Sequence, residues 1–122
     1  MAEMNLVRSL AIARLAVGGS AFATPRLAGR AFGLDADANP QAPYLARLFG
    51  ARDAALGIGI LVSGGDARRQ WLMIGAGCDA ADALAGLAGG RAGYLPKVTA
   101  ALVTTTALSA IVLGALALRE AD

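Results

Sequence analysis

The sequence predicts an all-α membrane protein, an antiparallel bundle of four transmembrane helices in a single domain spanning residues 1–122. The chain is 57% hydrophobic and only 16% charged, whereas soluble domains average about 25% charged residues. It contains 16 glycines, and glycine is frequent in membrane helices because it lets neighbouring backbones pack closely. It also contains four apolar stretches of about 20 residues, the length a bilayer requires. A soluble four-helix bundle is the alternative, and extraction without detergent would support it.

The four apolar stretches are separated by segments that favour turns. We expect a short amphipathic helix at the membrane surface over residues 25–34, with Thr24 as its N-cap and Pro25 as its first residue. Residues 35–43 are polar and contain two prolines, which predicts a loop. Residues 64–69 form a short polar turn, so the spans on either side are antiparallel neighbours. The expected spans cover residues 4–23, 44–63, 69–89 and 95–118.

The first apolar stretch also has features of a secretory signal peptide. Ala21-Phe22-Ala23 matches the small-residue pattern of a cleavage site. Arg14 lies in the middle of the apolar region, where a signal peptide carries no charge. We therefore interpret the segment as a membrane span.

Charge does not determine the orientation of the bundle. With the N-terminus inside, four basic residues fall on each side of the membrane, so the positive-inside rule does not decide. We expect a multi-pass protein of a bacterial plasma membrane.

The third span carries two acidic residues on a face that is otherwise made of small residues. Helical spacing places Gly75, Asp79, Asp82 and Gly86 in one stripe. The glycines allow another helix to approach closely, and the carboxylates then meet whatever that helix presents. The sequence is therefore expected to fold around this stripe.

Charged residues of three spans are expected at one depth. Arg14, Asp53 and Asp79 each lie about halfway along their spans, so an antiparallel bundle brings them together near the midplane. Asp82 lies one turn further along, where we expect Arg47 to meet it. Arg52 is about 100° around the helix from Asp53, and we expect it to face a neighbouring subunit or a cavity.

These three arginines and three aspartates form a neutral set with two interpretations. An unpaired aspartate or arginine at mid-bilayer costs roughly 2.5–3.5 kcal/mol, so pairing is expected. In the functional interpretation, Asp53, Asp79 and Asp82 are catalytic acids or bases, and a lipophilic substrate is held by Arg14, Arg47 and Arg52. In the structural interpretation, the pairs only fix the packing of the helices. A magnesium–diphosphate site at Asp79-x-x-Asp82 is a third alternative, and a lone D-x-x-D motif is weak evidence for it.

Composition excludes several other classes of function. The chain has no histidine, so the commonest general base and metal ligand is missing; we expect no metal and no cofactor. The single cysteine, Cys78, excludes an internal disulfide. Aromatic residues are only 5% of the chain, so nucleic-acid binding is not expected. The expected partners are membrane lipid, a small lipophilic ligand and further copies of the chain.

Three segments together resemble a known family. They are Arg14-Leu-Ala-Val-Gly18 with Pro25 and Phe32-Gly-Leu34, then Arg47-Leu-Phe-Gly-Ala-Arg-Asp53 with Leu56-Gly57, and Asp79-Ala-Ala-Asp82. Over nearly the whole chain the sequence resembles a family of small four-helix bacterial membrane proteins of unassigned function, distantly similar to DoxX-like proteins. The most specific part is R-x-x-G-x-R-D with D-x-x-D. The resemblance implies the four-span fold and no established activity.

Overall fold

The computed structural model describes residues 5–121, and this part of the chain is all-helical, without strands. This confirms the predicted all-α class. Four helices are long and one is short. They are α1 (Asn5–Ala23), α2 (Pro25–Ala31), α3 (Ala42–Val62), α4 (Gly65–Ala92) and α5 (Lys97–Glu120).

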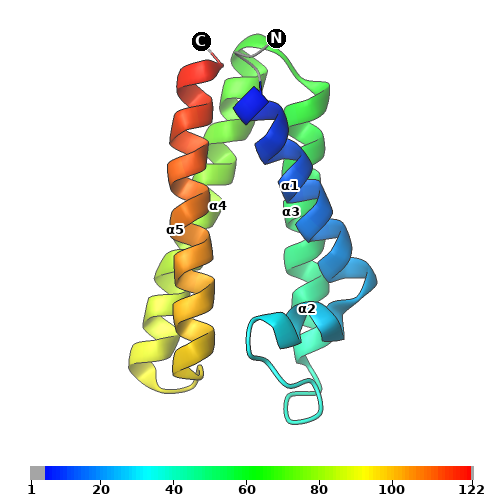
Figure 1. Cartoon of the computed structure of the whole chain (residues 1–122), viewed down its shortest axis with the longest axis vertical. Helices are drawn as coiled ribbons and strands as arrows, with labels where there is room; N and C mark the ends of the chain where they lie inside the picture. The colour runs from blue at the N-terminus through cyan, green and yellow to red at the C-terminus, as the bar shows by residue number, and fades with distance from the viewer. Residues whose placement is uncertain (1–4, 122) are drawn as a thin grey trace.

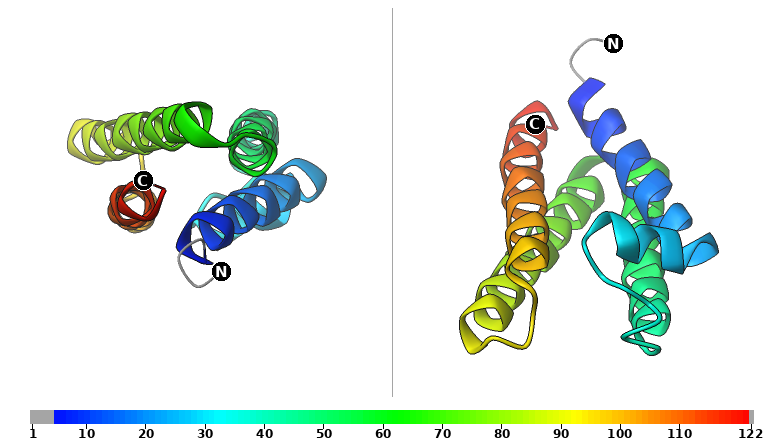
Figure 2. Two further views of the ribbon diagram at one scale, coloured as in Figure 1. Left: turned by 90° about the horizontal axis from the view of Figure 1, so that it is seen from above. Right: turned by 60° about the horizontal axis from the view of Figure 1, so that its bottom comes forward.

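The long helices pack as two pairs, α1 with α3 and α4 with α5 (Figure 1). The pairs meet at the end of the molecule where α1 begins and α5 finishes, and they diverge toward the other end (Figures 1 and 2). At the joined end the backbone N–H of Leu6 donates a hydrogen bond to Glu120 Oε1 at 3.1 Å. The beginning of α1 and the end of α5 are therefore neighbours.

A buried apolar cluster occupies the end where the pairs join. All four long helices contribute to it, with Val7, Leu10, Ala11, Ile60, Leu72 and Ala117. The outward surface is also apolar: Val62 is 78% exposed and Leu84 is 67% exposed. Extensive exposed apolar surface on a helical protein is typical of surfaces that contact a membrane or another protein.

Three helices are long and apolar enough to cross a membrane: α1 from Leu6 to Ala23, α4 and α5. They indicate a membrane protein. The helix α3 is 21 residues long, but it carries three charged residues, Arg47, Arg52 and Asp53.

Glycines bring α1 and α3 into backbone contact. A Cβ atom added to Gly50 would lie 2.5 Å from the carbonyl oxygen of Gly18, and one added to Gly57 would lie 2.6 Å from that of Ala11. Real Cβ atoms do not approach other atoms so closely, so only glycine allows this spacing. The close packing expected from the glycine content is therefore present in this pair.

The boundaries of α4 differ from the prediction. The helix begins at Gly65 and not at 69, so the predicted turn at 64–69 is wrong and only Ser63 and Gly64 are non-helical. Gly65 has a φ of 56°, which glycine adopts without strain, so the chain turns there within one residue. The helix also continues through Gly89 and Gly90 to Ala92, because these glycines are packing positions against Leu95 and α5 rather than breaks.

The other boundaries agree more closely with the prediction. Thr24 is the N-cap residue of α2 and Pro25 opens the helix, as expected, but the Thr24 hydroxyl donates to Ser20 O at 2.7 Å and makes no capping hydrogen bond. α2 ends at Ala31 and not at 34. α3 begins two residues earlier than predicted, and α5 covers 97–120 instead of 95–118. The predicted start of the first span at residue 4 lies outside the described residues.

Candidate functional site

Arg14 lies at the centre of the molecule, on the buried face of α1. Val7, Ala11 and Ala21 of the same face are buried, as the spacing predicts, and Arg14 itself is only 5% exposed. Two glycines make room for it. A Cβ added to Gly75 of α4 would lie 2.9 Å from Arg14 Nη2, and one added to Gly57 of α3 would lie 3.3 Å from Arg14 Cβ. The guanidinium group is therefore enclosed by α1, α3 and α4.

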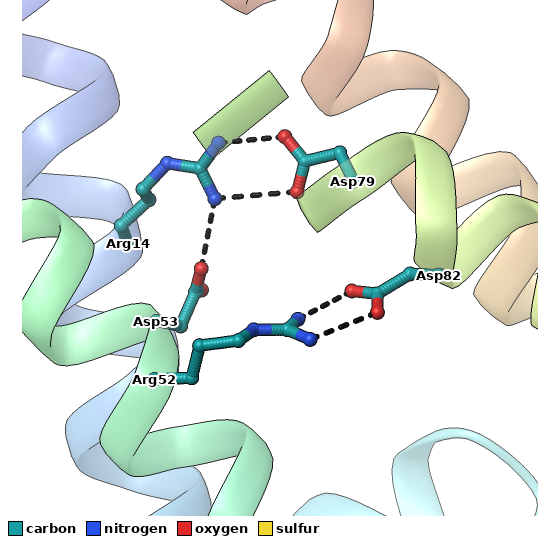
Figure 3. A network of polar contacts seen from close by, with 5 residues as sticks. All are labelled: Arg14, Arg52, Asp53, Asp79 and Asp82. Atoms are coloured by element: carbon teal, nitrogen blue, oxygen red, sulfur yellow. Dashed lines mark hydrogen bonds and ion pairs between the residues drawn. The ribbon is translucent and has the colours of Figure 1, made fainter. Parts of the chain in front are cut away.

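The guanidinium group of Arg14 binds two carboxylates from different helices (Figure 3). Nη1 donates to Asp53 Oδ1 at 2.8 Å, and the two Nη atoms donate to the two oxygens of Asp79 at 3.3 and 2.6 Å. The side chains of Asp53 and Asp79 are 9% and 7% exposed. The predicted meeting of Arg14 with Asp53 and Asp79 is confirmed in its strongest form, because one arginine holds both acids. We call these three residues the Arg14 network.

A second ion pair joins the two helix pairs next to the Arg14 network. Arg52 of α3 donates from Nη1 and Nη2 to the two carboxylate oxygens of Asp82 of α4, at 3.0 and 2.5 Å (Figure 3). The side chains are 36% and 30% exposed, so this pair is half-buried. The expectation that Arg52 faces a neighbouring subunit or a cavity is therefore wrong for this chain. Arg52 and Asp53 are separated by about 100° around the axis of α3. Asp53 therefore faces α1, and Arg52 faces α4.

Arg47 does not belong to the cluster. Its Nε donates to the carbonyl oxygen of Phe22 at 2.9 Å, and its guanidinium lies 5.8 Å from the centre of the Phe22 ring. The predicted contact between Arg47 and Asp82 is thus wrong. The physical reason is the divergence of the two helix pairs, which leaves α3 beside α1 at the level of Arg47 (Figure 1).

The cluster without Arg47 is not neutral. It holds two arginines, Arg14 and Arg52, and three aspartates, Asp53, Asp79 and Asp82. With all groups ionised, the formal charge is therefore −1 instead of the zero expected from the sequence. In addition, the buried Nε atoms of Arg14 and Arg52 have no hydrogen-bond partner among the described residues.

The sequence analysis missed one participant, Phe49. The guanidinium of Arg52 lies 5.2 Å from the centre of its ring, within the range of a cation–π contact. Because Phe49 and Arg52 are three residues apart on one helix, the i, i+3 spacing was an available signal. The Phe49 ring and the Asp82 carboxylate therefore both contact the Arg52 guanidinium group.

The predicted stripe on α4 divides between two neighbours. Gly75 and Asp79 face Arg14, whereas a Cβ added to Gly86 would lie 2.6 Å from Thr104 Oγ1 of α5. Asp82 lies at the edge between the two contacts. The stripe is thus a packing surface along its whole length. Its first part contacts the α1–α3 pair, and its last part contacts α5.

Two cavities lie away from the carboxylates. One, of about 280 Å³, is formed by α4 and α5 near the turn that joins them. The other, of about 450 Å³, is formed by the α1–α2 junction and the start of α3, with Arg26 and Arg47 in its wall. Neither is lined by Asp53, Asp79 or Asp82.

Comparison of the chain with models of known protein families, with curated proteins and with solved structures finds no match. The family resemblance described above, and the roles of the six charged residues, therefore stay predictions.

Proposed function

We propose that this chain is a non-enzymatic membrane subunit or scaffold in which the Arg14 network clamps the α1–α3 pair to the α4–α5 pair. The observation that carries the proposal is the pairing of both Asp53 and Asp79 with one buried arginine, at 2.6 to 3.3 Å. A catalytic acid needs contact with substrate, and the side chains of Asp53 and Asp79 are only 9% and 7% exposed. Charged pairs that cross a helix interface can instead specify which helices meet and in which register.

The proposal includes a membrane topology of four spans, with α3 as the fourth. A helix of 21 residues is about 31 Å long, enough to cross the hydrocarbon core. Of its three charged residues, Arg52 and Asp53 are paired inside the molecule. Its backbone contact with α1 at Gly50 and Gly57 supports this, because α1 is long and apolar enough to cross a membrane.

Cysteine labelling tests the topology in a Cys78→Ala background. If α3 crosses the membrane, Ala38→Cys and Gly64→Cys, which lie before and after it, are labelled from opposite sides of intact cells. If both positions are labelled from the same side, the four-span topology is wrong. A cysteine at position 121 serves as the control, because with four spans it should be labelled from the same side as the cysteine at position 64.

A combined substitution tests the clamp. We expect Arg14→Met/Asp53→Leu/Asp79→Leu to fold in detergent with a thermal midpoint near that of the wild type, because well-packed apolar residues can replace a buried ion network. We also expect the variant to recover the same cross-linked partners from membranes. A folded variant that loses a small molecule carried stoichiometrically by the wild type would overturn the scaffold proposal.

A second candidate function is a ligand site or acid–base centre for a small lipophilic substrate. The partial exposure of Arg52 and Asp82 favours it, because a hydrogen-bonding ligand could reach these two side chains. Mass spectrometry of organic extracts of the purified protein tests this candidate. It predicts a compound that is present with wild type and lost with Asp82→Asn, while the thermal midpoint stays the same.

A further inference from the structure

The cavity between α4 and α5 has features that the Arg14 network does not use. It is an open groove between the two helices. Its lining is mostly small residues, which let α4 and α5 pack closely beneath it. The groove is lined by Gly86, Leu87 and Gly90 of α4 and by Ala100, Ala101 and Thr105 of α5. By the helical rise it extends about 12 Å from Lys97 to Thr105.

One end of the groove carries two exposed cations without partners. Arg91 lies in the last turn of α4 and Lys97 is the first residue of α5, and both line the groove. Neither forms an ion pair or a side-chain hydrogen bond within residues 5–121. The start of α5 adds its free backbone N–H groups, since Pro96 provides no side-chain cap.

The groove also contains an unsatisfied polar atom. Thr104 lines it and is 9% exposed, and its Oγ1 has no hydrogen-bond partner in the described part of the chain. Hydroxyls in membrane helices usually bond to their own helix, as Ser109 does to Thr105 O at 2.9 Å. The Thr104 Oγ1 atom is buried against Gly86, so it belongs to the packing of the groove wall and is not a contact for an occupant.

The second cavity provides a contrast, because its cations are already engaged. Arg26 pairs with Asp37 at 2.6 Å, and Arg47 donates to Phe22 O. An anion there would compete with these partners. At the α4–α5 turn nothing has to be displaced.

We propose that the α4–α5 groove binds one anionic phospholipid, with the phosphate at Arg91 and Lys97 and the upper part of one acyl chain along the groove. Charge complementarity selects the headgroup: two unpaired cations and a helix N-terminus attract a phosphate, and basic pockets between membrane helices bind such headgroups. Because the two cations lie next to an apolar surface, the groove suits a lipid better than a free anion. The proposal does not depend on the function of the Arg14 network.

Native mass spectrometry of the detergent-purified protein tests this proposal, with dioleoyl phosphatidylglycerol as probe and dioleoyl phosphatidylcholine as reference. We expect one phosphatidylglycerol per chain to bind more tightly than phosphatidylcholine. Arg91→Gln/Lys97→Gln should weaken phosphatidylglycerol binding about tenfold or more. Ala101→Phe, which fills the groove without removing a charge, should weaken binding of both lipids.

The matched control is Arg30→Gln, which removes one charge from an exposed residue of α2 outside the groove and should leave binding unchanged. Because Arg91 and Lys97 are exposed and unpaired, lipid-free melts of their variants should match wild type. If the double variant does not fold, Lys97→Gln alone, with an expected loss of about fivefold, replaces it.

Three results would overturn the proposal. The first is equal affinity of wild type for the two lipids, or unchanged binding by Arg91→Gln/Lys97→Gln. The second is competition by glycerol 3-phosphate as strong as by the lipid, which would assign the groove to a free phosphate. The third is a change from dimer to monomer in Ala101→Phe, which would assign the groove to an interface between copies of the chain.

Discussion

The Arg14 network and the Arg52–Asp82 pair join the same two halves of the molecule, but they differ in burial and in connectivity. Arg14 is 5% exposed and holds two acids at once, whereas the side chains of Arg52 and Asp82 are 36% and 30% exposed and pair only with each other. A buried charge that loses its partner has no water to replace it, while a half-buried one is partly solvated. The comparison predicts that similar arginine–aspartate pairs contribute very differently to stability at positions one helical turn apart, because they differ in burial.

The largest effect is expected for Arg14→Met, because this change leaves Asp53 and Asp79 buried without a partner. We expect a loss of roughly 3–5 kcal/mol in unfolding free energy. Unfolding in mixed micelles, followed by circular dichroism, measures it. Arg52→Met is the matched control and should lose much less. Equal losses for the two variants would contradict the difference between the two sites.

A smaller effect is expected for Gly57→Ala, which pushes α1 away from α3 next to Arg14. The new Cβ would lie 2.6 Å from Ala11 O, a backbone atom that cannot move aside alone. Overpacking of this kind costs about 1–3 kcal/mol. Gly19→Ala on α1 is the control, because nothing lies within 4 Å of its added Cβ. If both variants melt alike, the close approach of α1 and α3 does not support the Arg14 network.

The sequence was sufficient to predict the helices and the centre of the site, because both depend on local spacing. Arg14, Asp53 and Asp79 lie halfway along their helices, and counting residues placed them at one depth. The partner of Asp82 could not be predicted in this way. The two helix pairs diverge, so Arg47 lies away from α4 and contacts Phe22 of α1. Arg52 forms the ion pair with Asp82 instead.

The structural role of the glycines in α4 was the second feature that the sequence could not predict. A Gly-Gly pair such as Gly89-Gly90 is typical of a helix break, yet α4 continues through it because Leu95 packs against Gly89 and Ala100 of α5 packs against Gly90. Whether a glycine ends a helix or receives a neighbour depends on tertiary contacts, which single-sequence patterns do not contain. The same contacts shape the α4–α5 groove, which no motif indicated.

The smallest effect is expected for Asp82→Asn. The amide still accepts a hydrogen bond from Arg52, the Phe49 ring still contacts the guanidinium, and the 36% exposure of the Arg52 side chain leaves its freed charge partly solvated. We expect a loss of about 1 kcal/mol or less, the range of exposed ion pairs. A double-mutant cycle with Arg52→Met measures the coupling energy of the pair directly. A coupling energy as large as the loss for Arg14→Met would mean that Asp82 is shielded from solvent and that its ion pair belongs to the clamp.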